Sequence, residues 1–211
     1  MPAGAVLRSN GPAMTFVYIV RCRFTEPRRE QAWNAWYSGP KIEQMLAQPH
    51  FRSCQRFRRA AGTGRDYLTV WTVESPRALD SPRYKAQWGF AEWTPHITDW
   101  SRDLFDGGAA SDTALAVAPD GALAVVTFDR MSEEDAAAAR AEAARADPEM
   151  MWLPAVGLAR HTPMIGLRPL AAGASAGAAP EHGDARVQRA VYRPITRHYR
   201  SPSVPLETDD R

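Results

Sequence analysis

The spacing of apolar residues over the first fifty positions predicts a buried strand followed by two helices. Residues 15–24 are rich in β-branched and aromatic residues, and both alternating faces begin apolar, which is typical of a central strand buried on two sides. Trp33, Trp36 and Tyr37 then fall on one helical face. The Ser-Gly-Pro run at 38–40 is expected to break this helix, because proline suits the first turn of a second, shorter one.

Two alternating segments follow, and each predicts a strand. Residues 51–60 carry four arginines, which are common at a sheet edge and costly in a central strand, so we expect an edge strand there. Residues 66–74 alternate with fewer charges. The next helix is expected to begin at Ser81, a capping residue followed by proline. After a Thr-Pro interruption, a helical turn is expected to resume through residues 96–105.

The second half of the chain repeats much of this order. Residues 113–129 predict two apolar strands around a Pro-Asp-Gly turn. Residues 132–147 form the clearest helix, rich in alanine and opened by residues at capping-box spacing. Residues 151–170 predict two extended segments, and residues 187–199 a last strand. Between them, residues 171–185 have the composition of a low-complexity linker.

This order of elements predicts an α+β fold built from two ferredoxin-like units. The first unit, at 14–118, reads β-α-β-β-α-β. The second unit, at 119–199, reads as a degenerate copy whose second helix is replaced by the linker. Residues 1–13 are expected to be a disordered leader and residues 200–211 a disordered tail, and Met14 could be the true start. Because such a sheet has helices on one face only, we expect the two sheets to stack and enclose a chamber lined by polar groups.

Residues 33–58, 66–84 and the tryptophans that follow resemble the dimeric α/β-barrel superfamily, and most closely its EthD-like members. Those proteins show an aromatic residue late in the first helix, a proline-bounded loop and an arginine-bearing second strand. The resemblance covers about residues 14–106 and implies a small-molecule chamber, since members include cofactor-free monooxygenases, isomerases, cyclases, decarboxylases and some haem enzymes. The sequence departs at Lys41, where such proteins often carry histidine, so a histidine mechanism at that position is in doubt.

Composition narrows the function classes. The net charge is only +2, whereas a nucleic-acid binder usually shows a basic stripe, so we expect no nucleic-acid partner. The basic residues are almost all arginine, with Lys41 and Lys85 the only lysines, and this bias carries little functional weight. No segment approaches the roughly 20 apolar residues that cross a membrane, and the N-terminus lacks a convincing signal-peptide cleavage site. Cys22 and Cys54 are expected to be buried free thiols, and we expect a cytoplasmic protein.

Two histidines are the candidates for acid–base chemistry. His96 and Asp99 are three residues apart, so on a helical turn the carboxylate could orient the imidazole, although such a pair could equally be structural. His50 stands at a junction between a loop and a strand, where functional residues are frequent. The histidines show no metal-binding spacing, so no metal is expected. His96 or His161 could serve as an axial ligand if haem were bound, but no cofactor is expected.

The candidate substrate-binding groups are an arginine and several aromatic residues. Arg21, on a strand predicted to be central, could bind the anionic end of a ligand or pair with a structural carboxylate. Three residues of the central strands either face the cavity, with Tyr67 as a proton donor, or belong to the core: Tyr18, Tyr67 and Trp71. Three more could reach the mouth of the chamber or pack between helix and sheet: Tyr84, Trp88 and Trp93.

The sequence therefore favours a cofactor-independent enzyme, an isomerase, cyclase, decarboxylase or dehydratase, that acts by proton transfer on a hydrophobic or aromatic acid. His96 or His50 would be the acid–base, Asp99 the orienting group, and Arg21 the anion clamp. Two alternatives stay open: a non-catalytic ligand-binding barrel, and a monooxygenase of the same fold that is cofactor-free or uses haem or flavin. A homodimer is expected unless the second half covers the first sheet.

Overall fold

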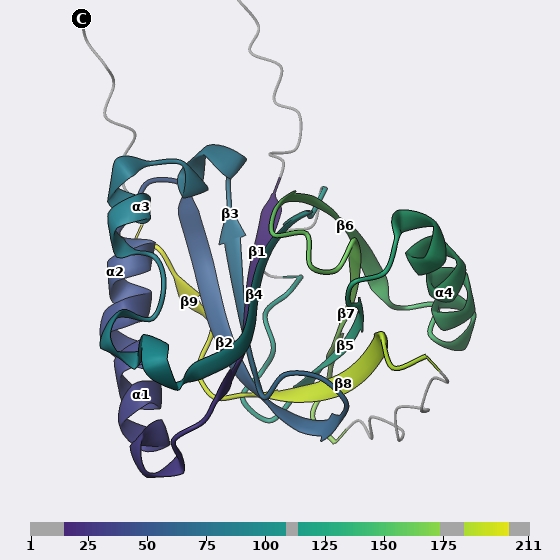
Figure 1. The fold of residues 1–211 in the computed structure, drawn as a ribbon, viewed down its shortest axis with the longest axis horizontal. Coiled ribbons are helices and arrows are strands. Elements are labelled where there is room, and N and C mark those ends of the chain that lie inside the picture. The colour runs from purple at the N-terminus through teal and green to yellow at the C-terminus, as the bar shows by residue number, and fades with distance from the viewer. Residues whose placement is uncertain (1–14, 109–113, 174–183, 203–211) are drawn as a thin grey trace, which may run out of the picture.

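The computed structural model describes residues 15–108, 114–173 and 184–202, and its strands form one sheet that closes on itself. The strand order is β3-β1-β4-β6-β7-β5-β8-β2, and β2 pairs again with β3, so these strands make a barrel. Figure 1 shows the barrel between two groups of helices, with α1, α2 and α3 on one side and α4 on the other.

The first half has the predicted ferredoxin-like topology. Its strands lie in the antiparallel order β4-β1-β3-β2. The strands are β1 (Phe16–Phe24), β2 (Phe51–Gly62), β3 (Tyr67–Val73) and β4 (Ile97–Asp106). The α-helices are α1 (Glu30–Trp36), α2 (Ile42–Leu46) and α3 (Pro82–Gln87). Short 3-10 helices are η1 (Pro27–Arg29), η3 (Pro76–Leu79) and η4 (Ala91–His96), and η2 (Tyr37–Lys41) is a π-helical turn.

The second half repeats that strand order, as the sequence predicted. Its strands lie in the order β6-β7-β5-β8, which corresponds to β2-β3-β1-β4 of the first half read in space. The elements are β5 (Ala122–Phe128), α4 (Glu133–Ala146), β6 (Met151–Leu158), β7 (Met164–Leu170) and β8 (Val187–Pro194), followed by β9 (Tyr199–Arg200) on the edge of β2. Most of the predicted linker lies outside the described residues, as do the predicted leader and most of the tail.

The two halves close the barrel within one chain. At one seam β4 pairs with β6, and at the other β2 pairs with β8. The prediction that residues 51–60 form an edge strand is therefore wrong, because β2 has neighbours on both sides. Its arginines are accommodated individually: Arg56, only 1% exposed, stacks against the rings of Trp33 and Tyr37 and donates to Ser38 Oγ at 2.7 Å.

Three further local predictions are corrected by the structure. Residues 96–105 do not continue as a helix, because η4 ends at His96 and β4 begins at the next residue. The Ser-Gly-Pro run at 38–40 does not break the helix but is carried in the π-helical turn η2, which leads directly into α2. Residues 114–118, the described part of the expected strand before the Pro-Asp-Gly turn, form no strand.

The helix starts follow the expected chemistry. The Ser81 hydroxyl accepts a hydrogen bond from the Tyr84 amide at the start of α3, with proline in the first position. Ser132 accepts from the Asp135 amide in the same way and opens α4. These caps fix where each helix leaves its loop, so the α3–η4 segment begins at a defined point beside the first sheet.

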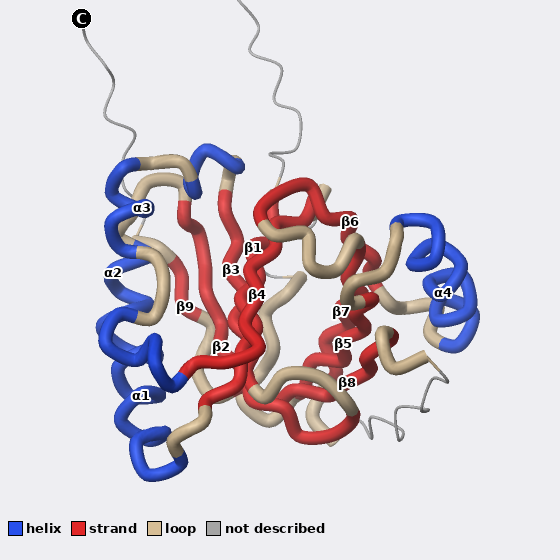
Figure 2. The backbone as a smooth tube through the Cα atoms, viewed as in Figure 1, coloured by secondary structure: helices blue, strands red, loops and turns tan. Residues whose placement is uncertain are grey.

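The barrel interior is packed with aliphatic residues and a buried cluster of ion pairs, and this contradicts the expected chamber between the sheets. Val17 and Ile19 of β1 point inward and pack against aliphatic residues of both halves, among them Leu68, Val125 and Leu167. The alternate residues of β1, Tyr18 and Val20 among them, face the helices. Figure 2 shows the strands of both halves around this interior, with the helices outside it. On the barrel side a hollow of about 190 Å³ lies beside Arg21 and Tyr192, whereas a hollow of about 360 Å³ lies on the helix side.

Candidate functional site

A cleft opens on the helix side of the first sheet, outside the barrel. Its floor is formed by Tyr18 and Val20 of β1 and Trp71 of β3. The segment between α3 and η4 forms one wall with Trp88 and Phe90. The empty volume is about 360 Å³, which includes the part that opens to solvent. The enclosed part is narrow and holds roughly one water molecule as the side chains stand.

Lys41 places a cation in this cleft. It stands at the end of the π-helical turn η2, and its side chain is only 5% exposed. Its ammonium donates a hydrogen bond to the backbone carbonyl of Gln87, at the end of α3. Burial penalises the charged form and lowers the pKa of Lys41 from 10.5 to about 8. Near neutral pH this amine can therefore both carry a charge and exchange a proton.

Arg102 of β4 brings a second cation to the same cleft. Its guanidinium lies 3.9 Å from the centre of the Trp88 ring, and its Nη1 donates to the Tyr84 hydroxyl at 3.1 Å. No carboxylate of the described residues forms an ion pair with Lys41 or Arg102. Two uncompensated cations among aromatic rings favour a ligand that is both anionic and hydrophobic.

Tyr18 and Tyr84 form a buried pair at the cleft floor. The Tyr84 hydroxyl donates to the Tyr18 oxygen at 3.0 Å, and the two rings meet edge to face. Burial, more than any charge, raises the pKa of Tyr18 well above its ordinary value of 10.0, so the phenol keeps its proton. Tyr18 is therefore a hydrogen-bond donor or acceptor in this cleft and not a base.

The other predicted aromatic residues divide between the cleft and the core. Trp71 and Trp88 line the cleft with Tyr18, and Tyr84 supports it from behind. Trp93 does not line it but packs in the helix-side core, with the Arg29 guanidinium 4.9 Å from its ring centre. Tyr67 does not line it either, and its hydroxyl donates to Glu30 Oε1 at 2.6 Å.

The structure does not bring the predicted histidine pair together. Asp99 lies on a strand with φ +44°, and its carboxylate pairs with Arg23 at 3.3 Å and Arg65 at 3.1 Å. His96 Nε2 lies instead 2.9 Å from Arg29 Nη1. His50 is exposed and lies 3.2 Å from Glu74 Oε2. None of these side chains lines the cleft. The helical turn that would have brought His96 next to Asp99 is absent, because β4 begins directly after His96.

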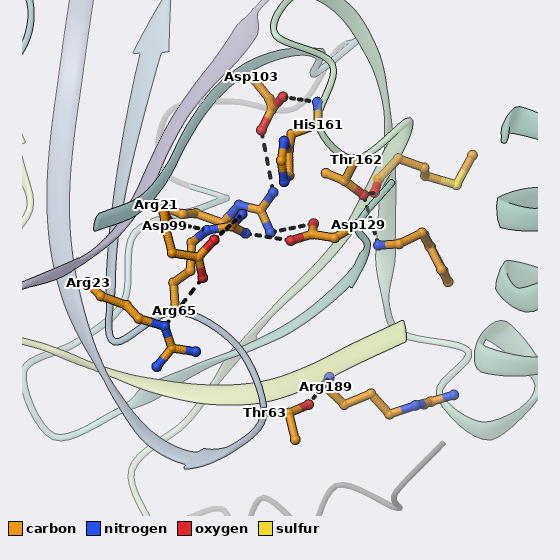
Figure 3. Close-up of polar contacts among 12 residues, drawn as sticks. Arg21, Arg23, Thr63, Arg65, Asp99, Asp103, Asp129, His161, Thr162 and Arg189 are labelled. Carbon is orange, nitrogen blue, oxygen red and sulfur yellow. Dashed lines mark hydrogen bonds and ion pairs between the residues drawn. The ribbon is translucent and has the colours of Figure 1, made fainter. Parts of the chain in front are cut away.

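Arg21 is part of a buried ion cluster and is not an anion clamp at the cleft. Its side chain points into the barrel, where Nη1 lies 2.9 Å from Asp129 and Nη2 lies 3.5 Å from Asp103. Arg65 Nη1 contacts the other oxygen of Asp129 at 2.5 Å. Figure 3 shows this cluster with the ring of His161 beside it. Two arginines and two buried aspartates balance in charge, so the cluster is a structural link between the halves.

Sequence reasoning missed Lys41 and Arg102, the two charges of the cleft. The signal for Lys41 was present, because it follows Pro40 at the position where the resembled proteins often carry histidine. Arg102 gave no local signal. It lies between a buried serine and a buried aspartate of β4, and only the pairing of β4 with β1 turns its side chain to the helix side.

The cleft does not fit a haem held by histidine. None of the four histidines in the described ranges, His50, His96, His161 and His198, lines it. Within the same ranges, no group of three or more potential ligands could hold a metal ion. The polar groups of the cleft are an amine, a guanidinium and phenols, which suit the binding of an organic anion better than the ligation of iron.

The fold is the dimeric α/β-barrel fold, here closed within one chain. The chain is similar to an anthrone oxidase-like protein of known structure, with a TM-score of 0.55 at 10% identity over 90% of this chain and 94% of that one. A chlorite dismutase-like protein aligns with a TM-score of 0.48 at 10% identity over 87% and 95%. A monooxygenase-like protein from Lactobacillus acidophilus aligns with 0.37 at 10% over 75% and 78%.

No family model and no curated protein matches the chain. The structural likeness therefore confirms the predicted fold, while the nearer resemblance to EthD-like members stays a prediction. None of the helices in the described ranges is both long and apolar enough to cross a membrane.

Proposed function

We propose that this protein is a small-molecule enzyme that acts by proton transfer on an aromatic or hydrophobic acid in the helix-side cleft. The observation that carries the proposal is the pair of cations, Lys41 and Arg102, which line one aromatic cleft without a carboxylate partner in the described chain. The acid–base role moves from His96 and His50 to Lys41, and the anion-binding role moves from Arg21 to Arg102.

Each group has a distinct part in this proposal. Arg102 binds the carboxylate of the ligand, since guanidinium groups match carboxylate geometry. The neutral amine of Lys41 takes a proton from a carbon next to a carbonyl, which leaves an enolate and an ammonium, and the ammonium returns the proton to the same or another carbon. Trp71 and Trp88 supply flat apolar walls for a ring. Isomerisation is the simplest outcome, and the proton transfer itself requires no cofactor.

A ring-sized ligand needs the cleft to widen, and Trp88 is the residue that can move. Its side chain is 40% exposed. The next residue, Gly89, has a φ of +93°, and a Cβ atom there would meet no other atom within 4 Å. The wall is therefore held by stacking on Arg102 and not by burial. When the ligand binds, the Arg102 guanidinium would lose its contact with the Trp88 ring and contact the ligand instead.

Hydrogen–deuterium exchange tests the proposal even while the reaction product is unidentified. Aryl keto acids such as 3-benzoylpropionate are incubated with the protein in D₂O, and loss of the proton signal beside the carbonyl is followed by NMR. We expect exchange above background, reduced about 100-fold or more in Lys41→Met. Lys41→Arg is the matched control, because it keeps the charge and removes a base that titrates near neutral pH.

Equal exchange rates in the wild type and Lys41→Arg would contradict the proposed acid–base role. Binding of aryl acids with no exchange for any member of the panel would indicate instead a non-catalytic ligand-binding protein.

A further inference from the structure

We infer that the Tyr18 hydroxyl is the hydrogen-bond donor to a single anionic oxygen, a phenolate or enolate, of the aromatic ligand in the cleft. Tyr84, which accepts a hydrogen bond from Arg102, is the positioning residue that directs the Tyr18 hydrogen there. This inference rests on the proposed function, since it names the kind of oxygen that the proposed site receives.

The direction of the hydrogen bonds carries the argument. A guanidinium has donors and no acceptor, so the Arg102 Nη1 contact of 3.1 Å makes the Tyr84 oxygen an acceptor. Tyr84 then gives its own hydrogen to the Tyr18 oxygen at 3.0 Å. The Tyr18 hydrogen is left over, and no acceptor for it exists among the described residues. Tyr18 lines the cleft, so an acceptor can be supplied there by a ligand.

The chain of donors strengthens Tyr18 in that role. Each bond in a directed series polarises the next, and here the series begins at a positive charge. The Tyr18 side chain is 4% exposed, so little water competes for its hydrogen. A donor prepared in this way, in a dry site, is the arrangement that stabilises negative charge developing on oxygen.

The surroundings select the oxygen that Tyr18 would meet. One hydroxyl offers one hydrogen, which suits a phenolate or enolate oxygen, whereas a carboxylate is better matched by the fork of Arg102. The positive charges of Arg102 and Lys41 favour the ionised ligand over the neutral one. Trp71 and Val20, on the cleft floor, offer an apolar surface to the aromatic ring that carries this oxygen. The site is therefore built for an aromatic compound with an acidic hydroxyl or an enolisable carbonyl.

Binding of 4-nitrophenol to the full chain tests this, because its ionisation is visible in the absorbance spectrum. We expect the wild type to bind the phenolate more tightly than the phenol, so that bound nitrophenol ionises at lower pH than free nitrophenol. Tyr18→Phe should weaken phenolate binding about tenfold or more, and Tyr84→Phe by a smaller factor, since it removes polarisation only. Tyr192→Phe is the matched control, because Tyr192 is a buried tyrosine of the barrel interior that donates to the Arg65 carbonyl.

A second measurement uses the unaltered protein, in case a Tyr18 variant does not fold. With labelled tyrosine, a strongly downfield hydroxyl proton should appear in the NMR spectrum when the phenolate is added. Phenolate binding that depends on Lys41 and Arg102 but shows neither this signal nor a loss in Tyr18→Phe overturns the inference and leaves the proposed function standing. Absence of phenolate binding, together with absence of deuterium exchange, overturns both.

Discussion

Arg21 Nη1 lies 2.9 Å from Asp129 Oδ1, so an ion pair joins β1 of the first unit to the residue that follows β5 of the second. The two residues are 108 positions apart, and both are buried. Asp129 also binds Arg65, which follows β2, so one carboxylate holds three segments of the barrel. The sequence suggested a reaction chamber in the barrel interior, but there buried ion pairs connect the two halves.

Removal of this carboxylate should weaken the fold. Asp129→Asn removes the carboxylate that two buried guanidinium groups share, and leaves Arg21 with Asp103 at 3.5 Å and Arg65 with Asp99 at 3.1 Å. We expect a loss of up to about 3–5 kcal/mol in the free energy of unfolding. Urea denaturation followed by tryptophan fluorescence measures it. Asp80→Asn is the control, because Asp80 pairs with Lys85 at 3.7 Å on the surface, where such pairs contribute about 0–1 kcal/mol. Equal losses in the two variants would contradict the link.

The same carboxylate predicts how stability depends on acid. Burial raises the pKa of Asp129, but the guanidinium groups of Arg21 and Arg65 outweigh it and hold the pKa below 3.8. Because this pKa is lower in the folded than in the unfolded chain, its stabilisation is complete above the unfolded pKa and is lost as the pH falls through the folded one. Denaturation below about pH 4 should therefore be steeper in the wild type than in Asp129→Asn. Asp103, His161 and Asp99 face the same cluster (Figure 3) and are unchanged in the variant.

Lys41 predicts a rate that rises with pH. Burial lowers its pKa to about 8, so the neutral amine that accepts a proton becomes the main form only above that value. The deuterium exchange rate should therefore increase through about pH 8 and level off. Lys41→Arg should show no such rise, since arginine stays charged throughout the range. A wild-type rate that does not change between pH 7 and 9 would count against Lys41 as the base. That window spans about one unit on each side of the expected pKa, which is the usual spread of lysine pKa values in proteins.

The buried Lys41 should also lower the stability of the folded protein near neutral pH. Because its pKa is lower in the folded chain than the ordinary 10.5, the protonated form is disfavoured by folding, and this cost is present below pH 8 and fades as the pH rises toward 10.5. Lys41→Met should then raise the free energy of unfolding near pH 7 by about 1–3 kcal/mol while it lowers the exchange rate about 100-fold or more. Thermal unfolding at pH 7 and pH 10 measures it. A Met variant that is less stable at both pH values would show a structural role.

Gly62 lies where β2 pairs with β8, and the structure there leaves no room for a larger residue. Its φ is +79°, and a Cβ atom there would lie 2.1 Å from the Arg189 carbonyl oxygen. Gly62→Ala should therefore cost about 1–3 kcal/mol or more, because strain adds to a clash with backbone that cannot move aside. Gly39→Ala is the matched control, since its Cβ meets nothing within 4 Å. Chemical denaturation of both variants gives the comparison.

The sequence predicted the order of elements well where periodicity is local. The apolar alternation of residues 15–24 and 66–74 and the alanine-rich helix after Ser132 all correspond to observed elements. The strand order of the second unit was also predicted. These features depend on neighbours along the chain, which a single sequence displays.

The strand β4 shows why other parts could not be predicted. Asp103 is fully buried there, and a buried carboxylate argues against a central strand until its partner Arg21, 82 positions away, is known. The cleft has the same origin. Lys41, Tyr18 and Arg102 come from three elements, and only the pairing of β1 with β4 and the close approach of α3 bring them to one place. Local spacing predicted neighbours such as His96 and Asp99 instead, and the turn it assumed does not form.

Closure of the barrel inside one polypeptide has a consequence for how the two halves can differ. When two identical subunits form such a barrel, symmetry requires every change to appear twice. Here the first half carries the cationic aromatic cleft on the face of its sheet that α1, α2 and α3 cover, whereas the second half has one alanine-rich helix over its sheet (Figure 1). A single substitution can thus change the shape of the cleft while the second half of the barrel stays unchanged.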